Sequence, residues 1–395
     1  MLLLEAKPSL FIILSRFPYP LEKGDKLRAY NQIKSLAETY DITLACCTDR
    51  TIPENELKEV QQFCQSIHLF PLTKTGLLFE LIRSFFSGKP FQVQYFYRLK
   101  HARKIKQLLS DLKPDHIYCQ LVRVAEYVKD YHFCPKTIDY MDALSKGMER
   151  RIDTEKWFKR WFYRNESKRL SRYERGIFDY FEHKVIISLQ DRNFILHPKN
   201  TTIKIIPNGV DAAFFEDLNC KKQFDILFTG NFSYAPNIEA AVFLAEKLLP
   251  ALNQKGLTPS ILLSGANPTQ RILNLASNQV TVSGWVDDIR VSYQSSRLFI
   301  APLFIGTGLQ NKLLEAMASG LPCITTSLAN NALKGKNHKN IELAENFNEF
   351  VEITTRFLND KDIFNELALN GRNFVEQNYT WKTQNALLND LFQSS

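Results

Sequence analysis

The chain has 395 residues, of which 45% are hydrophobic and 23% are charged. This composition excludes a disordered protein, and the length is sufficient for two packed domains. Lysine and arginine outnumber the acidic residues and give a net charge of +8, which favours anionic partners and leaves the fold open.

No segment resembles a membrane span or an export signal. The longest apolar runs, residues 9–15 and 298–306, are strand-sized and fall well short of the roughly 18 residues that cross a bilayer. The first residues, MLLLEAKPS, hold an acidic residue and a proline where a secretory signal needs a basic and then an apolar segment. The seven cysteines are odd in number and lack CxxC spacing, so we expect a reduced, cytoplasmic protein.

In the first half, short apolar runs alternate with longer amphipathic stretches, which is typical of βα units and parallel sheets. The expected strands are residues 11–15, 42–48, 67–72, 116–119, 137–140, 185–188 and 203–206. The expected helices are residues 26–38, 54–64, 77–86 and 102–112, followed by a long basic segment.

This basic segment, residues 149–175, carries ten lysines and arginines against five acidic residues. Its aromatic residues recur at the spacings of one helix stripe: Trp157, Phe158, Trp161, Phe162 and Tyr173. Two interpretations stay open, a surface helix that packs its aromatics on its own domain and a helix that faces an anionic membrane or an acceptor. Nucleic acid is not expected as a partner, because no RNP motif or zinc-finger spacing is present.

Residues 206–211, IPNGVD, contain turn chemistry that suits a chain leaving one sheet for another. The pattern then repeats, with strands expected at 224–229, 260–263, 280–282, 298–301 and 323–326. Helices are expected at 238–248, 268–276, 286–294 and 309–318, with shorter ones after 347 and an amphipathic helix at 379–392. The recurrence of an α/β set predicts two domains of this class.

The stretch GTGLQNKLLEAMASGLP, residues 306–322, follows an expected strand and opens a helix. Glycines at a helix N-terminus let an anion approach unpaired N–H groups. Lys312 can reach the same anion, and Glu315 lies on the same helix face, where a carboxylate can bind two hydroxyls of a ribose. The alternative is a plain turn followed by an intrahelical Lys312–Glu315 pair on a buried helix.

The sequence lacks the motifs of dinucleotide binding, P-loops, acyl transfer and metal binding. GxGxxG is absent from the first strand–helix junction, and GxxxxGK[ST] and GxSxG are absent from the chain. The seven histidines are scattered and form no HxH or HExxH, so no metal site is expected.

These motifs resemble the donor-binding half of family 4 glycosyltransferases of the GT-B fold. The residues that carry the resemblance are PNGVD (207–211), Gly284 before the helix expected at 286, and LLEAMASGLPCITT (313–326). Three further stretches, residues 15–38, 138–145 and 265–268, are similar to a bacterial group associated with exopolysaccharide and exosortase loci.

The resemblance implies an α/β GT-B fold with two Rossmann-like domains facing across a cleft. An acceptor-side domain would comprise residues 1–206 with a C-terminal helix at about 379–395, and a donor-binding domain would comprise residues 207–378. It also implies metal-independent transfer from a nucleotide-sugar, without a cofactor, and retention of anomeric configuration.

Carried over by position, Glu315 would bind the ribose hydroxyls and Lys312 would neighbour the diphosphate. The donor-binding residues implied in this way are Gly230, Asn231, Gly284, Trp285, Val286, Gly306, Thr307, Gly308, Leu309, Gln310, Asn311, Lys312 and Glu315. Gly284 to Val286 would place backbone groups near the base.

On the acceptor side, the resemblance implies catalytic candidates near the ends of two expected strands, Gly24, Asp25, Arg28, Asp139 and Asp142. Gly24 matches a glycine loop that approaches the donor phosphate or the acceptor. Asp25 could instead cap a helix that starts at Lys26, and Arg28 could be a solvated surface residue. Asp139 and Asp142 could orient an acceptor hydroxyl, and ordinary strand-end caps are equally compatible with the pattern.

The sequence departs from the family pattern at two places. Thr307 stands where the family has the first glutamate of a Glu-x7-Glu motif, and no arginine or lysine occurs in FTGNFSYAPN (228–237). Positive charge for the leaving diphosphate would therefore come from Lys312, helix dipoles, Arg290 or Arg16. The narrower bacterial group shares both changes.

The function expected from these observations is retaining transfer of a sugar from a nucleotide-sugar to a lipid-linked or polysaccharide acceptor in cell-surface glycan synthesis. The enzyme would be cytoplasmic, with residues 149–175 as the candidate for peripheral attachment to the inner face of the cytoplasmic membrane. The alternatives are a nucleotide-sugar epimerase or hydrolase on the same scaffold, and a catalytically silent nucleotide-sugar-binding protein.

Overall fold

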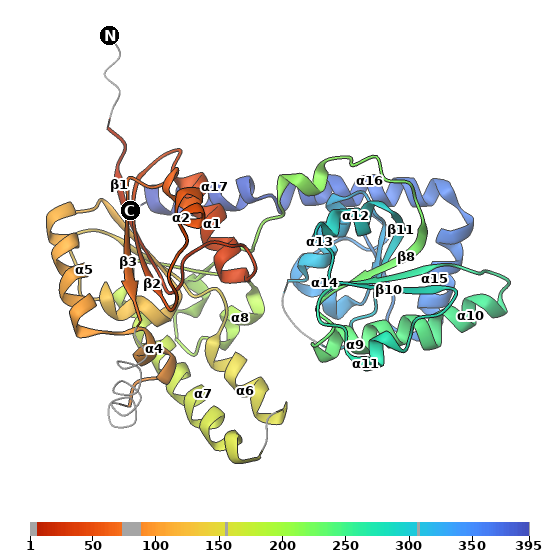
Figure 1. Cartoon of the computed structure of the whole chain (residues 1–395), viewed down its shortest axis with the longest axis horizontal. Coiled ribbons are helices and arrows are strands. Elements are labelled where there is room, and N and C mark those ends of the chain that lie inside the picture. The colour runs from red at the N-terminus through yellow and green to blue at the C-terminus, as the bar shows by residue number, and fades with distance from the viewer. Residues whose placement is uncertain (1–5, 73–87, 155–156, 306–308, 395) are drawn as a thin grey trace, which may run out of the picture. The chain divides into compact units, whose positions relative to one another are not determined.

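The computed structural model describes residues 6–72, 88–154, 157–305 and 309–394, and each statement below refers to these. The chain divides into two compact units (Figure 1). The first unit comprises Met1–Pro207 and Asn385–Ser395, and the second comprises Asn208–Gln384.

The first unit is built on a parallel sheet with the strand order β3-β2-β1-β4-β5-β6-β7. Its strands are β1 Ser9–Leu14, β2 Asp41–Thr48, β3 Ser66–Pro71, β4 His116–Gln120, β5 Lys136–Asp139, β6 His183–Ile186 and β7 Lys204–Ile205. Its helices are α1 Gly24–Leu36, α2 Glu54–Gln61, α4 Phe91–Phe96, α5 Leu99–Leu112, α6 Leu144–Thr154, α7 Trp157–Ile177 and α8 Leu189–Phe194, with short 3-10 turns such as η1 Val122–Tyr127.

The central strand β1 shows why this sheet is covered by helices on both faces. Side chains alternate along a strand, and Leu10, Ile12 and Leu14 enter one core cluster while Phe11 and Ile13 enter another. All five are at most 1% exposed. A continuous apolar run of this kind is typical of a parallel strand buried on both sides.

The end of the last helix, α17 Trp381–Gln393, packs on the first unit. Leu388 and Phe392 belong to the same core cluster as Leu10. The ring of Phe392 stacks on that of His116 at 4.2 Å between centroids, and Asn385 donates a hydrogen bond of 3.0 Å to the carbonyl oxygen of Asn31.

The second unit contains a parallel sheet with the strand order β10-β9-β8-β11-β12-β13. Its strands are β8 Phe224–Thr229, β9 Ile261–Ser264, β10 Val280–Gly284, β11 Ser296–Ala301, β12 Cys323–Thr325 and β13 Glu342–Leu343. Its helices include α9 Ala235–Val242, the π-helical η5 Phe243–Leu248, α10 Leu249–Gln254, α11 Gln270–Leu273, α12 Ile289–Gln294, α13 Asn311–Ala318, α14 Ser327–Leu333, α15 Phe347–Asn359 and α16 Lys361–Asn378. Together the two sheets confirm the α/β class expected from the sequence.

Several helices differ in extent from the prediction. The helix expected at 286–294 begins at Ile289, because the side chain of Asp288 accepts a hydrogen bond from the N–H of Arg290 and caps it. The helix expected at 268–276 is reduced to Gln270–Leu273, and the helix expected at 77–86 lies outside the described residues.

The basic segment forms two helices, α6 and α7, where a single helix was expected. The interpretation that its aromatics pack on their own domain is wrong for two of them, since Trp157 is 82% exposed and Trp161 is 63% exposed. Along the described chain, no helix combines the length and the apolar character that crossing a membrane requires.

Candidate functional site

A pocket of about 340 Å³ lies in the second unit where the strands β8, β9 and β10 end. In parallel α/β sheets, this carboxyl edge is where ligands bind. The residues that line it are Thr229, Gly230, Asn231, Ser264, Gly265, Ala266, Trp285, Val286, Asp287, Ile289, Lys312 and Glu315. Six of the residues expected to bind a donor therefore meet in one hollow: Gly230, Asn231, Trp285, Val286, Lys312 and Glu315.

Two glycines let neighbouring backbones approach closely at the floor of this pocket. A Cβ atom on Gly265 would lie 1.9 Å from the carbonyl oxygen of Gly230, and Gly265 has a φ of +152°. A Cβ atom on Gly230 would lie 2.7 Å from Nδ2 of Asn237 and 3.1 Å from Nζ of Lys312. Side chains are excluded at both positions, because neighbouring protein atoms already occupy the space that a Cβ atom would take.

Lys312 lies one residue inside α13 and extends its ammonium group into the pocket. Nζ donates a hydrogen bond of 2.5 Å to Oδ1 of Asn237 and lies 4.7 Å from the centre of the Phe228 ring. Burial lowers the pKa of Lys312 to about 8, and the charge of Glu315 opposes this shift. The group is therefore mostly charged at pH 7 and available to an anion.

Glu315 lies one turn further along α13 and is held by a tyrosine. The hydroxyl of Tyr293 donates a hydrogen bond of 2.8 Å to Oε2 of Glu315 and lies 2.8 Å from Oγ1 of Thr229. Burial raises the pKa of Glu315, while Tyr293 and Lys312 oppose the rise. A fixed carboxylate of this kind can accept hydrogen bonds from a pair of hydroxyls.

The turn after β10 forms another wall of the pocket. Gly284 has a φ of +69°, a left-handed conformation that favours glycine. Trp285 follows with 74% of its surface exposed, so a flat apolar face is open to a ligand beside Val286.

The predicted donor residues just before and at the start of α13, Leu309, Gln310 and Asn311, are not among the residues that line the pocket. Leu309 packs partly buried against the core of the unit, Gln310 precedes the helix in an extended conformation, and Asn311 is the first helical residue. Gly306, Thr307 and Gly308 lie outside the described residues, so the expectation attached to them remains a prediction.

Arg28 and Asp139 contact each other in the first unit. Nε of Arg28 lies 2.6 Å from Oδ2 of Asp139, and both side chains are completely buried. Asp139 also accepts hydrogen bonds from the hydroxyl of Tyr118 at 2.6 Å and from the N–H of Met141 at 2.9 Å. The interpretation of Arg28 as a solvated surface residue is therefore wrong.

The other acceptor-side candidates lie closer to the surface. Gly24 is the first residue of α1, and Asp25 is in its first turn. Asp25 forms an ion pair of 2.9 Å with Arg16, and the interpretation of Asp25 as a helix cap is wrong because α1 begins before it. Asp142 is exposed just after β5. Their catalytic roles remain predictions.

Arg290, one of the expected sources of positive charge, is compensated by acidic neighbours. It lies 2.7 Å from Asp288 and 3.4 Å from Glu216. Lys312 is thus the cation among the residues that line the pocket.

Sequence reasoning missed Gly265, which lines the pocket, and the two residues that hold its charged side chains, Tyr293 beside Glu315 and Asn237 beside Lys312. A buried tyrosine hydroxyl needs a hydrogen-bond partner, and only the folded chain reveals that Tyr293 is 0% exposed. Asn237 contacts Lys312 across 75 positions of the sequence, and no local pattern marks such a pair.

Comparison with known proteins identifies the domain that holds this pocket. Residues 223–360 match the model of a family described as "Glycosyl transferases group 1". The chain carries a group 1 glycosyltransferase domain. All the residues that line the pocket lie within this domain, and the expected enzyme class, a glycosyltransferase, is thereby confirmed.

One curated relative extends the similarity of this glycosyltransferase over most of its length. It is an "Uncharacterized 44.6 kDa protein in cps region" of Klebsiella pneumoniae, 19% identical over 397 residues that cover 94% of this chain and 97% of the relative.

Solved structures show the fold of the glycosyltransferase. Sucrose-phosphate synthase from Thermosynechococcus elongatus is similar with a TM-score of 0.67, 16% identity and coverage of 98% of this chain and 99% of that one. HepE from Anabaena, in complex with UDP and glucose, has a TM-score of 0.65, 15% identity and coverage of 98% and 100%. WaaG, "a glycosyltransferase involved in lipopolysaccharide biosynthesis", has a TM-score of 0.60, 13% identity and coverage of 98% and 100%. These likenesses confirm the GT-B fold.

Proposed function

We propose that this glycosyltransferase transfers a sugar from a nucleotide-sugar to a lipid-linked or polysaccharide acceptor in cell-surface glycan synthesis, with retention of anomeric configuration. The observation that carries the proposal is the convergence of Lys312 and Glu315 on one pocket at the carboxyl edge of the second sheet. The relative from a cps region supports glycan synthesis as the context, and the UDP and glucose bound to HepE support a nucleotide-sugar donor.

The two side chains would divide the recognition of the donor. Lys312 would bind the diphosphate, because a charged amine in a partly dehydrated pocket stabilises the negative charge that develops as the nucleotide leaves. Glu315, oriented by Tyr293, would accept hydrogen bonds from the ribose hydroxyls. The exposed face of Trp285 would support the base by stacking.

The chemistry that these residues can supply is positioning and electrostatic stabilisation. Holding donor and acceptor together converts a bimolecular step into an effectively unimolecular one. The bond between the anomeric carbon and the diphosphate oxygen would break as the acceptor hydroxyl forms the new glycosidic bond on the same face of the sugar. The hydroxyl proton would pass to the departing diphosphate, and the ammonium of Lys312 would offset the negative charge that remains on it. NMR of the product formed from an α-linked donor would contradict retention if it showed a β-linkage.

Association with an anionic membrane is the second part of the proposal. The exposed Trp157 and Trp161 lie on α7 in a segment with twice as many basic as acidic residues. Indole rings and cations together suit the interface of an anionic bilayer. A lipid-linked acceptor would be reached at such a surface.

Donor binding can be tested with UDP-glucose, UDP and the GDP, ADP and CMP counterparts in a calorimetric titration. We expect at least one of them to bind the unaltered chain and to bind Lys312→Met and Glu315→Gln at least about tenfold more weakly, since each loses a charge-assisted hydrogen bond. Lys247→Met, on the same unit and outside the pocket, serves as the matched control. Equal affinity of all three variants for every nucleotide would contradict the donor site.

A further inference from the structure

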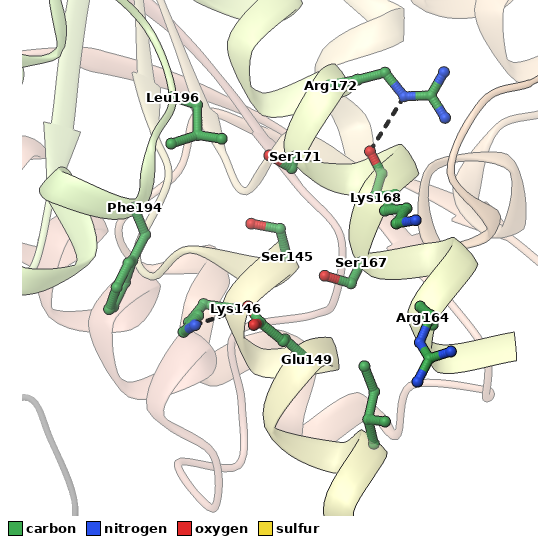
Figure 2. A pocket seen from close by; sticks show the side chains of 11 residues that line it. Ser145, Lys146, Glu149, Arg164, Ser167, Lys168, Ser171, Arg172, Phe194 and Leu196 are labelled. Carbon is green, nitrogen blue, oxygen red and sulfur yellow. Dashed lines mark hydrogen bonds and ion pairs between the residues drawn. The ribbon is translucent and has the colours of Figure 1, made fainter. Parts of the chain in front are cut away.

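A groove of about 710 Å³ lies between α6 and α7 in the first unit, among residues that the proposed donor site does not use (Figure 2). The residues that line it are Ser145, Lys146, Glu149, Ile152, Arg164, Ser167, Lys168, Ser171, Arg172, Phe194 and Leu196. Four of them are cations and one is a carboxylate, so the groove attracts anions.

The α7 wall of the groove carries the excess positive charge. Arg164, Lys168 and Arg172 follow one another at intervals of four residues, which places them in a row on one helix face. Glu149 is paired with Lys146 at 2.8 Å. No carboxylate in the described part of the chain forms an ion pair with the three cations of the α7 row, which therefore stay available to a ligand.

The groove also offers hydroxyl and apolar contacts. Ser145 on α6 and Ser167 and Ser171 on α7 line the groove (Figure 2). Phe194 and Leu196 line the side away from α7, and Leu196 is 62% exposed. Hydroxyls beside cations suit a phosphate, and the half-buried Phe194 and the exposed Leu196 next to them suit a hydrocarbon chain attached to it.

The two exposed tryptophans belong to the same helix face as the cations. The spacing from Trp157 to Trp161 is four residues and from Trp161 to Arg164 three, so the five side chains form one stripe along α7. With a rise of about 1.5 Å per residue, the cations lie roughly 5 to 17 Å beyond Trp161 along the helix. A helix with its indole rings in a lipid surface would thus hold its cations at the level of the phosphates.

We infer that the α6–α7 groove binds the phosphate group of a phosphorylated lipid whose chain lies against the apolar side chains of Phe194 and Leu196. The occupant is identified by its chemistry, a phosphate or diphosphate ester of a long hydrocarbon chain in a membrane. The inference rests on the proposed function in one respect, that this lipid would be the anchor of the acceptor.

The test uses the full chain and three probes in calorimetric titrations below the micelle concentration: farnesyl diphosphate, inorganic diphosphate and farnesol. We expect farnesyl diphosphate to bind and the other two to bind at least about tenfold more weakly, because each offers only half of the contacts. The triple variant Arg164→Gln, Lys168→Gln, Arg172→Gln should weaken the binding of farnesyl diphosphate by at least about tenfold.

The matched control removes the same charge elsewhere on the first unit. Lys34, Arg103 and Lys106 are exposed on α1 and α5, and their joint replacement by glutamine should change the affinity by less than about twofold, since distant exposed charges are screened. A second groove variant, Ser171→Phe, keeps every charge and fills the groove, and it should also weaken binding. Melting curves check that each variant is folded.

Several outcomes would overturn the inference. If the two triple variants lose the same affinity for farnesyl diphosphate, the binding is explained by net charge alone. If the unaltered chain binds inorganic diphosphate as tightly as farnesyl diphosphate, the groove is a site for free phosphate. If Lys312→Met no longer binds farnesyl diphosphate, the ligand occupies the proposed donor pocket and not the groove. Donor binding is measured separately on the groove variants: its failure in the unaltered chain contradicts the proposed function and leaves the groove result standing.

Discussion

Tyr293 donates a hydrogen bond of 2.8 Å to Glu315, and the same hydroxyl lies 2.8 Å from Oγ1 of Thr229 at the end of β8. One buried phenol therefore connects the sheet, α12 and α13. Glu315 lines the proposed donor pocket, and the position of its carboxylate therefore depends on a residue that does not itself line the pocket.

Replacing Tyr293 with phenylalanine should weaken both the fold and the donor site. Without the hydroxyl, the half-buried Glu315 and the buried Thr229 each lose a hydrogen-bond partner, so we expect the free energy of unfolding to fall by about 1–2 kcal/mol. The carboxylate of Glu315 is then free to turn, and the dissociation constant of the nucleotide should rise several-fold. Thermal melting and calorimetric titration measure the two effects. Tyr234→Phe, at a tyrosine that is 55% exposed, is the control and should change neither quantity.

Donor binding should depend on pH through Lys312. Its pKa is lowered to about 8 by burial, and a bound phosphate favours the charged form and raises it again. Binding therefore takes up a proton above pH 8, and affinity is fully present below that pH and falls as the pH rises, by up to about tenfold per unit. Titration of the nucleotide between pH 6.5 and 9.5 measures this slope, and the phosphate's own ionisation, near pH 6, lies outside the window.

The variant Lys312→Arg separates this cause from others. A guanidinium stays charged throughout the range, so the decline above pH 8 should disappear while binding at pH 7 is retained in part. An unchanged slope in this variant would show that another group titrates.

The buried strands were the part of the fold that the sequence predicts best. β1 and β2 read as continuous apolar runs because both faces of the sheet are covered, as the burial of Leu10 to Leu14 shows. Helix starts were less accurate, since the start of α12 depends on the capping side chain of Asp288. Several polar residues near a helix start can act as its cap, and the local backbone geometry determines which of them does.

Site residues that are close in the sequence were also easier to predict than site residues that are far apart in it. Lys312 and Glu315 share one helix turn, so their convergence is visible in the spacing. Arg28 and Asp139 are separated by 111 positions, and each was interpreted separately as a catalytic candidate. Charged residues are usually exposed, and only the folded chain reveals that these two are buried against each other.

Gly230 is a position where one added methyl group should disturb the donor pocket. Its Cβ would meet the side chain of Asn237 at 2.7 Å and Nζ of Lys312 at 3.1 Å. Asn237 is held by its hydrogen bond of 2.9 Å to the carbonyl of Asn231, so it cannot easily withdraw. Gly230→Ala should therefore displace Lys312, weaken nucleotide binding by about tenfold and destabilise the chain by about 1–3 kcal/mol.

The control for this variant is Gly176→Ala, a helical glycine at which an added Cβ would have nothing within 4 Å. Alanine stabilises a helix by up to about 1 kcal/mol relative to glycine, and donor affinity should stay unchanged. If both alanine variants bind the nucleotide equally well, the close packing at Gly230 is irrelevant to the ligand.

The Arg28–Asp139 pair offers a prediction that distinguishes structure from catalysis. Arg28→Met leaves a carboxylate buried without its cation, so we expect the free energy of unfolding to fall by about 3–5 kcal/mol. Urea denaturation monitored through the first unit measures it. Lys58→Met breaks the exposed pair with Glu54 in the same unit and should cost less than about 1 kcal/mol. If Arg28→Met is instead as stable as this control variant but loses sugar transfer, Arg28 acts in the reaction and its side chain becomes accessible during catalysis.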